Sequence, residues 1–209
     1  MNVSEIEYRS LVSVSALSME NYRELADLIY DTDPYIYPAM FGNRDNAARL
    51  LPILFRNGDS MFCLNNVFVA LCGRRIVGLL LWKKGRLEWS PELLKRLAAE
   101  NGIEISPHLD DVAKEYVDMY AAEDKDDIVS LINLSVAGEL HGRGIGRAIL
   151  ERFFAEKHGR RYELCVLADN KNAVHLYRSL GFEPVEYYAG FSVQGSPPHA
   201  VRMRKEENE

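Results

Sequence analysis

A glycine-rich stretch at residues 141–147, with the sequence HGRGIGR, constrains the fold of this chain more than any other segment. The run before it, residues 128–136, consists mainly of β-branched and large apolar residues, which predicts a buried strand. After it, apolar residues recur at the spacing of one helical face, at Ile145, Ala148, Ile149 and Phe153. The stretch therefore predicts a strand, a glycine loop and a helix, in that order.

A helix that begins after a glycine loop can bind an anion. Its first backbone N–H groups have no partner within the helix, and the helix dipole places partial positive charge there. Glycine allows positive φ and close approach of a ligand, so a phosphate can rest against these groups. Arg143 and Arg147 add positive charge beside the same point. The alternative is a glycine-rich turn with two solvated arginines, and this pattern by itself does not decide between the two.

Length and composition indicate one globular domain. The chain has 209 residues, of which 47% are hydrophobic and 27% charged, and these values exclude a disordered chain. No apolar run is long enough to span a bilayer and the first residues lack a signal-peptide pattern, so we expect no membrane contact and a cytoplasmic location. The net charge of −6 argues against a nucleic-acid-binding surface.

The cysteines and histidines predict neither disulfides nor a metal site. The three cysteines are odd in number and widely spaced, and they include no CxxC pair. Cys72 and Cys165 lie in apolar, strand-like runs, so we expect both to be small buried hydrophobes. The five histidines show no ligand spacing, and we expect no metal cofactor.

The N-terminal part predicts one strand and two helices on either side of an aromatic loop. Residues 8–16 alternate like a strand, and Ser18 has the chemistry of an N-cap for a helix that ends near Asp31. Two prolines follow, so we expect an ordered loop over residues 31–43. Its aromatic side chains either pack on the core or line a pocket, and we expect packing. A second helix is expected over residues 45–56.

The rest of the chain predicts a sheet with helices on both faces. Apolar runs on either side of a short Gly-Arg-Arg turn predict a hairpin, and a Ser-Pro pair predicts a helix start at Ser90. The expected strands are residues 66–72, 76–82, 128–136, 161–167, 185–193 and 200–203, and the expected later helices begin at residues 90, 107, 145 and 170. This order predicts an α/β (α+β) fold.

Two separated motifs resemble those of one enzyme family. The loop His141-Gly142-Arg143-Gly144-Ile145-Gly146 is similar to the pattern Gln/Arg-x-x-Gly-x-Gly/Ala. The segment that begins Asn170-Lys171-Asn172-Ala173 and reaches Leu176-Tyr177, followed by Gly181-Phe182, is similar to Asn-x-x-Ala-x-x-Leu-Tyr with a later Gly-Phe. Through these motifs the chain resembles the GNAT superfamily of acyl-CoA-dependent N-acetyltransferases. His141 departs from the pattern, because the family has Gln or Arg there, and the departure puts an outer cofactor contact in question.

The resemblance implies a single acetyltransferase domain over residues 1–209, with a mixed, mostly antiparallel sheet of about six to seven strands. It implies a helical insertion at about residues 84–126 and a cofactor-binding core at about residues 128–182. Acetyl-CoA would be the acyl donor, with no metal. Its implied contacts are Leu134, Ser135, Val136, His141, Gly142, Arg143, Gly144, Ile145, Gly146, Arg147, Asn170, Asn172, Ala173 and Tyr177.

Tyr177 is the residue that the resemblance assigns to protonation of the leaving thiolate. A phenol with a pKa of about 10 stays protonated at neutral pH, whereas a thiol of about 8.5 leaves as the thiolate and needs a proton. Backbone N–H groups near Leu134 could stabilise the oxyanion. Asn133 lies where such families often place an acid, and it cannot accept a proton, so the base stays open between a water chain to a carboxylate, His108 and solvent.

The acceptor is expected to be a primary amine of a small molecule or a protein, which attacks the thioester directly in a ternary complex. The resemblance places it near Tyr35, Tyr37, Asn133 and Tyr116, and acidic residues such as Asp110 could attract its charge, although solvation explains them more simply. We expect a monomer or homodimer. The alternative function is a non-catalytic acyl-CoA-binding or sensing module. A dinucleotide-binding loop fits less well, because its glycines have another spacing.

Overall fold

A seven-stranded sheet with the order β1-β2-β3-β4-β5-β7-β6 organises the computed structural model of the chain. The structure describes residues 5–11, 17–85, 90–120, 128–157, 161–188 and 200–206, with only the backbone for residues 115–120. Neighbouring strands are antiparallel except β4 and β5, which are parallel. The strands are β1 (Ile6–Ser10), β2 (Val67–Cys72), β3 (Arg75–Lys84), β4 (Ile128–Val136), β5 (Arg161–Leu167), β6 (Glu183–Tyr188) and β7 (Ala200–Glu206).

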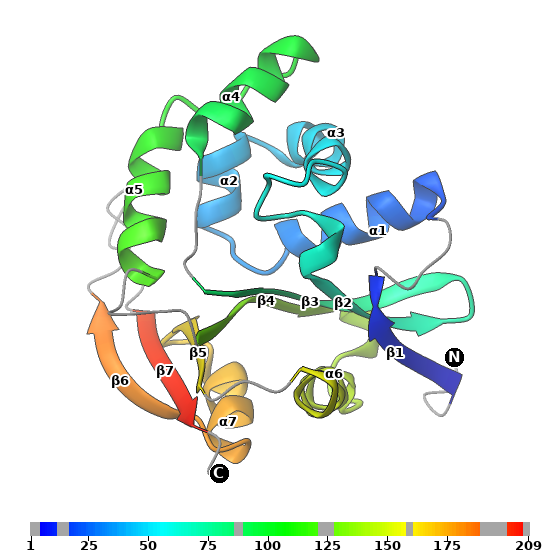
Figure 1. The fold of residues 1–209 in the computed structure, drawn as a ribbon, viewed down its shortest axis with the longest axis vertical. Coiled ribbons are helices and arrows are strands. Elements are labelled where there is room, and N and C mark those ends of the chain that lie inside the picture. The colour runs from blue at the N-terminus through cyan, green and yellow to red at the C-terminus, as the bar shows by residue number, and fades with distance from the viewer. Residues whose placement is uncertain are drawn as a thin grey trace.

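Helices cover both faces of the sheet, as Figure 1 shows: α1 to α5 lie on one face, and α6 and α7 lie on the other. Short 3-10 turns η3 (Leu64–Asn66) and η4 (Gly138–Leu140) precede β2 and the glycine loop. The helices are α1 (Met19–Tyr30), α2 (Ile36–Phe41), α3 (Arg44–Phe55), α4 (Pro91–Glu100), α5 (Leu109–Tyr120), α6 (Ile145–Glu156) and α7 (Lys171–Ser179). The predicted mixed, mostly antiparallel sheet between two helical layers is confirmed.

Local signals in the sequence mark most of these elements correctly. Ser18 caps α1 by accepting from the backbone N–H of Asn21, and Ser90 caps α4 in the same way from Leu93. The predicted strand over residues 161–167 is β5 itself. The expected strands at 8–16 and 185–193 are placed too late, because β1 and β6 begin at Ile6 and Glu183; residues 12–16 and 189–193 lie outside the described part of the chain.

The prediction of a loop over residues 31–43 is wrong, because this segment contains α2. Asp33 stabilises the start of α2: its Oδ1 atom accepts from the N–H groups of Tyr35 and Ile36, at 2.8 Å each. Pro38 is the third residue of α2, where a helix residue has no intrahelical N–H partner to lose. Tyr37 and Phe41 are buried, as the packing interpretation expected, and Tyr35 is exposed.

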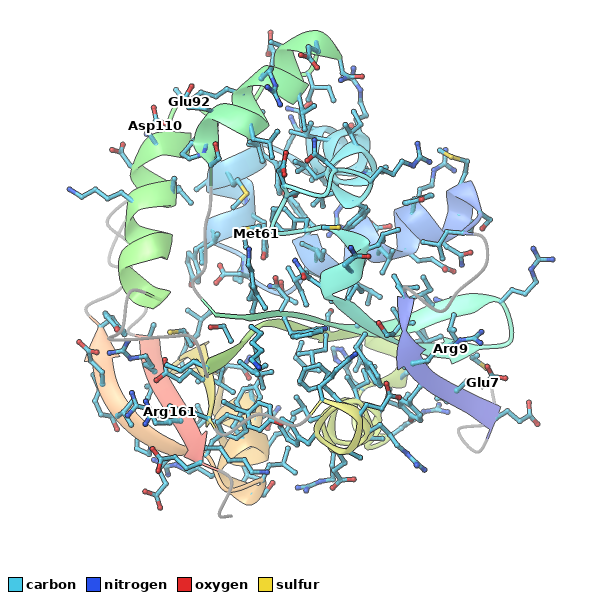
Figure 2. The ribbon with its side chains drawn as sticks, viewed as in Figure 1. Glu7, Arg9, Met61, Glu92, Asp110 and Arg161 are labelled. Carbon is cyan, nitrogen blue, oxygen red and sulfur yellow. The ribbon has the colours of Figure 1, made fainter. Side chains whose placement is uncertain are left out.

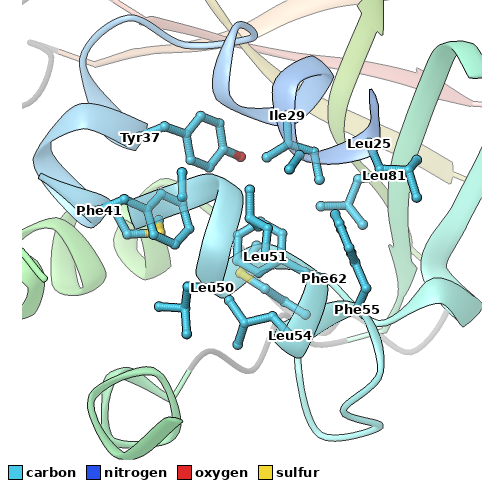
Figure 3. Packing of buried hydrophobic residues seen from close by; sticks show 14 of the residues in the cluster. Leu25, Ile29, Tyr37, Phe41, Leu50, Leu51, Leu54, Phe55, Phe62 and Leu81 are labelled. Atoms are coloured by element: carbon cyan, nitrogen blue, oxygen red, sulfur yellow. The ribbon is translucent and has the colours of Figure 1, made fainter. Parts of the chain in front are cut away.

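Each face of the sheet contributes to its own hydrophobic core. Alternate residues of β2 show the division, because Val67 and Val69 pack beneath α1 to α5, whereas Phe68 and Ala70 pack beneath α6. Figure 3 shows part of the first core, where Tyr37 and Phe41 from α2 lie among leucine and phenylalanine side chains.

The expectation that Cys72 and Cys165 are buried is wrong, because both are only half-buried. Cys63 is the buried cysteine.

A glycine in β3 lets α6 pack closely on the sheet. A Cβ atom at Gly78 would lie 2.9 Å from Cδ1 of Ile149, which real Cβ atoms essentially never show, and 3.0 Å from the carbonyl oxygen of Ser135, which is tighter than most real Cβ contacts. The missing side chain therefore sets the position of α6 against β3 and β4, and with it the position of the glycine loop that leads into α6.

Candidate active site

The sheet opens between its two parallel strands. β4 and β5 pair from Ile128–Arg161 to Leu131–Leu164, and no further pair follows. Beyond that point β4 pairs only with β3, and β5 only with β7. The N–H group of Ala137 donates to Val77 of β3, so by the alternation of an antiparallel ladder the peptide groups of Leu134 and Val136 face away from β3. Among the described residues, the end of β4 thus has no partner strand on the side of the opening.

A β-bulge in β4 turns two consecutive side chains toward α1 and α2. Asn133 pairs with Leu81 and Leu131 pairs with Trp82, which leaves Ile132 as the extra residue. Ile132 packs in the core beneath α1 to α5, and Asn133 bonds to residues of that same layer. Leu131 and Leu134, on either side, pack against the other core. The bulge therefore aims Asn133 into the opening from the α1–α2 side.

A cavity of about 100 Å³ occupies the opening. Its walls come from both strands, residues 132–134 of β4 and 165–167 of β5, and from both helical layers. The α1–α2 segment supplies Thr32, Asp33, Ile36 and Tyr37, and the α7 segment supplies Asn170, Ala173 and Tyr177. Because these two segments cover opposite faces of the sheet (Figure 1), the cavity joins the two faces.

Asn133 holds a chain of hydrogen bonds on the α1–α2 side of the cavity. The Tyr37 hydroxyl donates to Oδ1 of Asn133 at 2.7 Å, and Nδ2 of Asn133 donates to Oγ1 of Thr32 at 2.7 Å. Thr32 in turn donates to the carbonyl oxygen of Ile29 at 2.6 Å. The amide is fixed in one orientation by these contacts, which a carboxylate could not reproduce because it donates no hydrogen bond.

Asp33 is a site residue that the sequence interpretation missed. It lines the cavity beside Asn133, and burial raises the pKa of its carboxyl group above the ordinary value of 3.8. The two backbone N–H groups that it accepts lower the pKa and only partly offset this burial effect. The sequence does contain a signal for Asp33. An aspartate just before a helix can accept hydrogen bonds from the first N–H groups of that helix, so the Asp-Pro pair can mark the start of a helix as well as the end of one.

Tyr177 enters the cavity from α7. Its side chain is 9% exposed, and its ring packs edge-on against Phe182 with the centroids 5.8 Å apart. Burial raises the pKa of Tyr177, so the phenol stays protonated throughout the neutral range. Within the described part of the chain, its hydroxyl has no hydrogen-bond partner, so the proton is available to a ligand in the cavity.

The glycine loop has the backbone conformation that an anion cradle requires. Gly142 and Gly144 have φ of +73° and +79°, in the left-handed region that favours glycine, and no atom lies within 4 Å of a Cβ built on either. Gly144 caps α6 without any side-chain hydrogen bond. The first N–H groups of α6 therefore point out of the helix without a side chain to satisfy them. Gly146 packs beside Leu134, Val136 and Leu176, which joins the loop to β4 and α7.

The two arginines and the histidine of the loop differ in their hydrogen bonds and ion pairs. Arg143 is exposed and forms no ion pair with any described residue, whereas Arg147 donates to Ser179 of α7 and pairs with Glu151. His141, the departure from the family pattern, turns back toward β4: its Nε2 atom lies 2.7 Å from the carbonyl oxygen of Val136. A carbonyl only accepts, so this nitrogen carries the hydrogen. The histidine thus ties the loop to the end of β4 and occupies the outward carbonyl of Val136.

The start of α7 lies on the same side of the opening as the glycine loop. Asn170 caps α7 by accepting from the N–H of Ala173 at 3.1 Å, and both residues line the cavity. Asn172 is exposed on the outer side of the same turn. Ser135, between the two outward-facing peptide groups of β4, is half-buried and pairs with Leu79. The structure thus brings the strand end, the loop and the start of α7 to one edge of the opening.

Other predicted residues lie away from the cavity or outside what the structure describes. Tyr35 is 42% exposed and does not line the cavity, and His108 is exposed before α5. The Tyr116 side chain lies outside the described residues. Asp110, labelled beside Glu92 in Figure 2, accepts from Lys95 at 2.8 Å, so this charge joins α5 to α4.

The described residues include neither a candidate metal site nor a candidate membrane-spanning helix. No group of three or more His, Cys, Asp or Glu side chains is arranged to hold a metal ion within the described ranges. None of the helices that the structure describes is both long and apolar enough to cross a bilayer.

Sequence comparison finds acetyltransferases. The family model of the GNAT acetyltransferase domain matches residues 108–184, which include β4, the glycine loop and α7. An uncharacterized N-acetyltransferase of Methanocaldococcus jannaschii is 37% identical over 71 residues, which are 32% of this chain and 31% of that protein. The match thus spans about a third of the length of this curated relative.

Structure comparison extends the likeness to the whole fold. A crystal structure of an acetyltransferase superposes with a TM-score of 0.66 at 18% identity, covering 97% of this chain and all of the other. The NatC complex bound to Gag peptide and CoA gives a TM-score of 0.52 at 13% identity, with 98% and 99% of the two chains covered. At these identities the likeness establishes the fold.

Proposed function

We propose that this chain, which belongs to the GNAT superfamily of acetyltransferases, transfers an acetyl group from acetyl-CoA to a primary amine. In this proposal residues 1–209 act as one acetyltransferase domain, and the amine attacks the thioester directly in a ternary complex. The observation that carries the proposal is the opening between β4 and β5. There the end of β4 has no partner strand among the described residues, the glycine loop at one end suits an anion, and the buried phenol of Tyr177 lies beside it.

The residues at this opening suit the parts of a CoA thioester. The outward carbonyl group of Leu134 and the outward N–H group of Val136 could pair with the amides of pantetheine as an added strand would. The first N–H groups of α6, with Gly142 and Gly144 in left-handed conformations, suit a pyrophosphate. Arg143 has no other partner among the described residues and could add an ion pair to a phosphate. A structurally similar protein is described with CoA bound, which supports this ligand.

Tyr177 supplies a proton in this proposal. Acetyl-CoA brings an acetyl group that is activated as a thioester. The buried phenol keeps its proton at neutral pH and can donate it to the sulfur as charge develops there. The N–H group of Leu134 faces the same cavity and could donate to the oxyanion. Asn133 orients Tyr37 and accepts no proton.

A two-stage experiment tests the proposal. Acetyl-CoA should raise the melting temperature of the protein at saturating concentration, and the absence of any shift would sink both an enzyme and a sensing module. Release of free thiol across a panel of primary amines then separates the two. Turnover with at least one amine supports the transferase, whereas acetyl-CoA binding without any amine-dependent thiol release favours the non-catalytic module. Steady-state rates measured with both substrates varied distinguish the two routes: sequential kinetics indicate direct attack in a ternary complex, whereas ping-pong kinetics indicate an acyl-enzyme.

A further inference from the structure

We infer that the Asp33 carboxylate binds the ammonium group of the acceptor and takes its proton, and that the acceptor is an amine with no carboxylate beside it. This inference rests on the proposed function, since it concerns the second substrate of the same cavity. It assigns the base that the sequence leaves open, and it narrows the class of amine that the site can accept.

The Asp33 carboxylate has one oxygen occupied and one available. Oδ1 accepts the N–H groups of Tyr35 and Ile36 at 2.8 Å each, which fixes the carboxylate plane at the start of α2. Oδ2 has no partner among the residues that the structure describes. Because Asp33 lines the cavity together with Asn133 and Thr32, this second oxygen is a preorganised acceptor beside the site of acyl transfer.

The negative charge of Asp33 favours an acceptor that enters the cavity as a cation. Asp33 is the one Asp, Glu, Lys, Arg or His among the described cavity-lining residues. The other titratable groups that line the cavity are Tyr37 from α2, Cys165 from β5 and Tyr177 from α7. The neighbouring cation Arg44 pairs with Asp27 and Asp31 and does not line the cavity. A half-buried carboxylate without a cation beside it in the cavity attracts an ammonium ion.

The same charge pattern disfavours a carboxylate on the acceptor. In a free α-amino acid the carboxylate is two bonds from the amine, so both groups must enter a cavity of about 100 Å³. None of the described lining residues is a cation that could pair with it. A buried charge without a partner is costly, and Asp33 would repel it as well. Alkyl amines and amines next to a neutral amide avoid this cost.

Burial also promotes the proton transfer. Removing an ammonium–carboxylate pair from water disfavours both charged forms, so it shifts the pair toward free amine and carboxylic acid. The raised pKa of Asp33 has the same cause and acts in the same direction. One ammonium proton passes to Asp33. The amine nitrogen then forms the C–N bond, the C–S bond breaks, and the sulfur takes the Tyr177 proton. The second nitrogen proton returns to Tyr177, and Asp33 releases its proton to solvent.

The substitution Asp33→Asn separates charge from structure. An asparagine Oδ1 can still accept the two N–H groups that start α2, so the fold and the binding of acetyl-CoA should be unchanged. We expect kcat/KM for n-butylamine to fall by about 100-fold or more, with loss of the acidic limb that Asp33 ionisation gives the wild-type pH profile. Asp31→Asn is the matched control, because Asp31 pairs with Arg44 outside the cavity, and we expect it to behave as wild type. A D33N enzyme with wild-type rate and pH profile would overturn the inference.

A second comparison tests the substrate class. Alaninamide and alanine differ only in the neutral or charged group beside the amine, and we expect alaninamide to be at least about tenfold better at equal concentrations of free amine, from an unpaired-charge cost of about 1.4 kcal/mol or more. Equal or better use of alanine would contradict the inference while leaving the proposed transferase intact.

Ammonium binding can be measured even if no amine is turned over. By calorimetry, n-butylammonium should bind the wild-type protein more tightly than n-butanol does, and D33N should lose this preference. An absent preference in the wild type, or an unchanged one in D33N, would overturn the inference. Failure of the proposed function has a different signature, namely no melting-temperature shift with acetyl-CoA.

Discussion

The two sides of the opening between β4 and β5 are built in different ways. The side that we propose for acetyl-CoA, the cofactor side, is formed mainly by backbone groups: the end of β4, the first N–H groups of α6 and two glycines in left-handed conformations. The side that we propose for the amine, the acceptor side, is formed by the side chains of Asp33, Tyr37 and Asn133, from two segments distant in sequence. A backbone-built site tolerates many side chains but depends on conformation, whereas a side-chain-built site depends on individual functional groups. The two sides should therefore respond differently to substitution.

The largest effect is expected at Tyr177, where one hydroxyl serves the chemistry. Tyr177→Phe should lower kcat by about 100-fold, and leave the acetyl-CoA-induced melting shift unchanged, because the hydroxyl has no partner among the described residues to lose. Since burial raises its pKa, wild-type kcat should show no loss from Tyr177 ionisation between neutral and mildly alkaline pH. Steady-state kinetics over this range check both points. Tyr187→Phe, at a 67% exposed side chain, is the control, and equal rates for the two variants would remove Tyr177 from the acid role.

A backbone change should weaken the cofactor side without touching any functional side chain. Gly144→Ala places a Cβ at φ +79°, which costs about 1 kcal/mol unless the loop rearranges. Rearrangement would move the N–H groups of the cradle, so we expect acetyl-CoA to bind about tenfold more weakly by calorimetry. Gly85 has the same φ of +79° and equally open surroundings, at the end of β3. Gly85→Ala should cost similar stability at no cost in affinity, and equal affinity losses would contradict a specific cradle.

Hydrogen bonds on the acceptor side should couple distant segments. A double-mutant cycle of Tyr37→Phe and Asn133→Ala should give an interaction energy of about 1 kcal/mol in the free energy of unfolding, since each single variant breaks the same buried bond. Denaturant unfolding of the four proteins measures it. Additive effects would mean that this bond contributes nothing to the placement of α2 against β4.

The smallest effect is expected on the free energy of unfolding, which the ionisation of Asp33 should lower. The pKa of Asp33 is higher in the folded protein than its ordinary value of 3.8, so between these two values the folded state keeps a proton that the unfolded state has released. The free energy of unfolding of the wild type should therefore fall slightly relative to that of Asp33→Asn as pH rises through that window. Unfolding midpoints of both proteins across acidic pH values test the sign, and a relative change in the opposite direction would contradict a carboxylate that burial destabilises.

The backbone elements of the proposed cofactor side could be predicted from the sequence because their determinants are local. The strand 128–136, the glycine loop and the Asn170 cap each depend on a few neighbouring residues, and the structure contains all of them. The acceptor side was predicted in part: Tyr37 and Asn133 were named, but their hydrogen bond joins residues 96 positions apart. Asp33 was missed because its proline neighbour suggested a break, whereas its side chain starts α2. The bulge at Ile132 depends on the register with β3, which no local pattern specifies.

That bulge makes strand length as important as strand composition. Because side chains alternate along β4, the one extra residue at Ile132 is what places Asn133 on the α1–α2 face and Leu134 on the α6 face. Deletion of a single residue there would restore a regular strand and exchange the two faces for part of β4. Many substitutions at Ile132 leave the number of residues in β4 unchanged, so Asn133 and Leu134 stay on their faces of the sheet. A one-residue insertion or deletion, harmless in most surface loops, would here remove the acceptor side in one step.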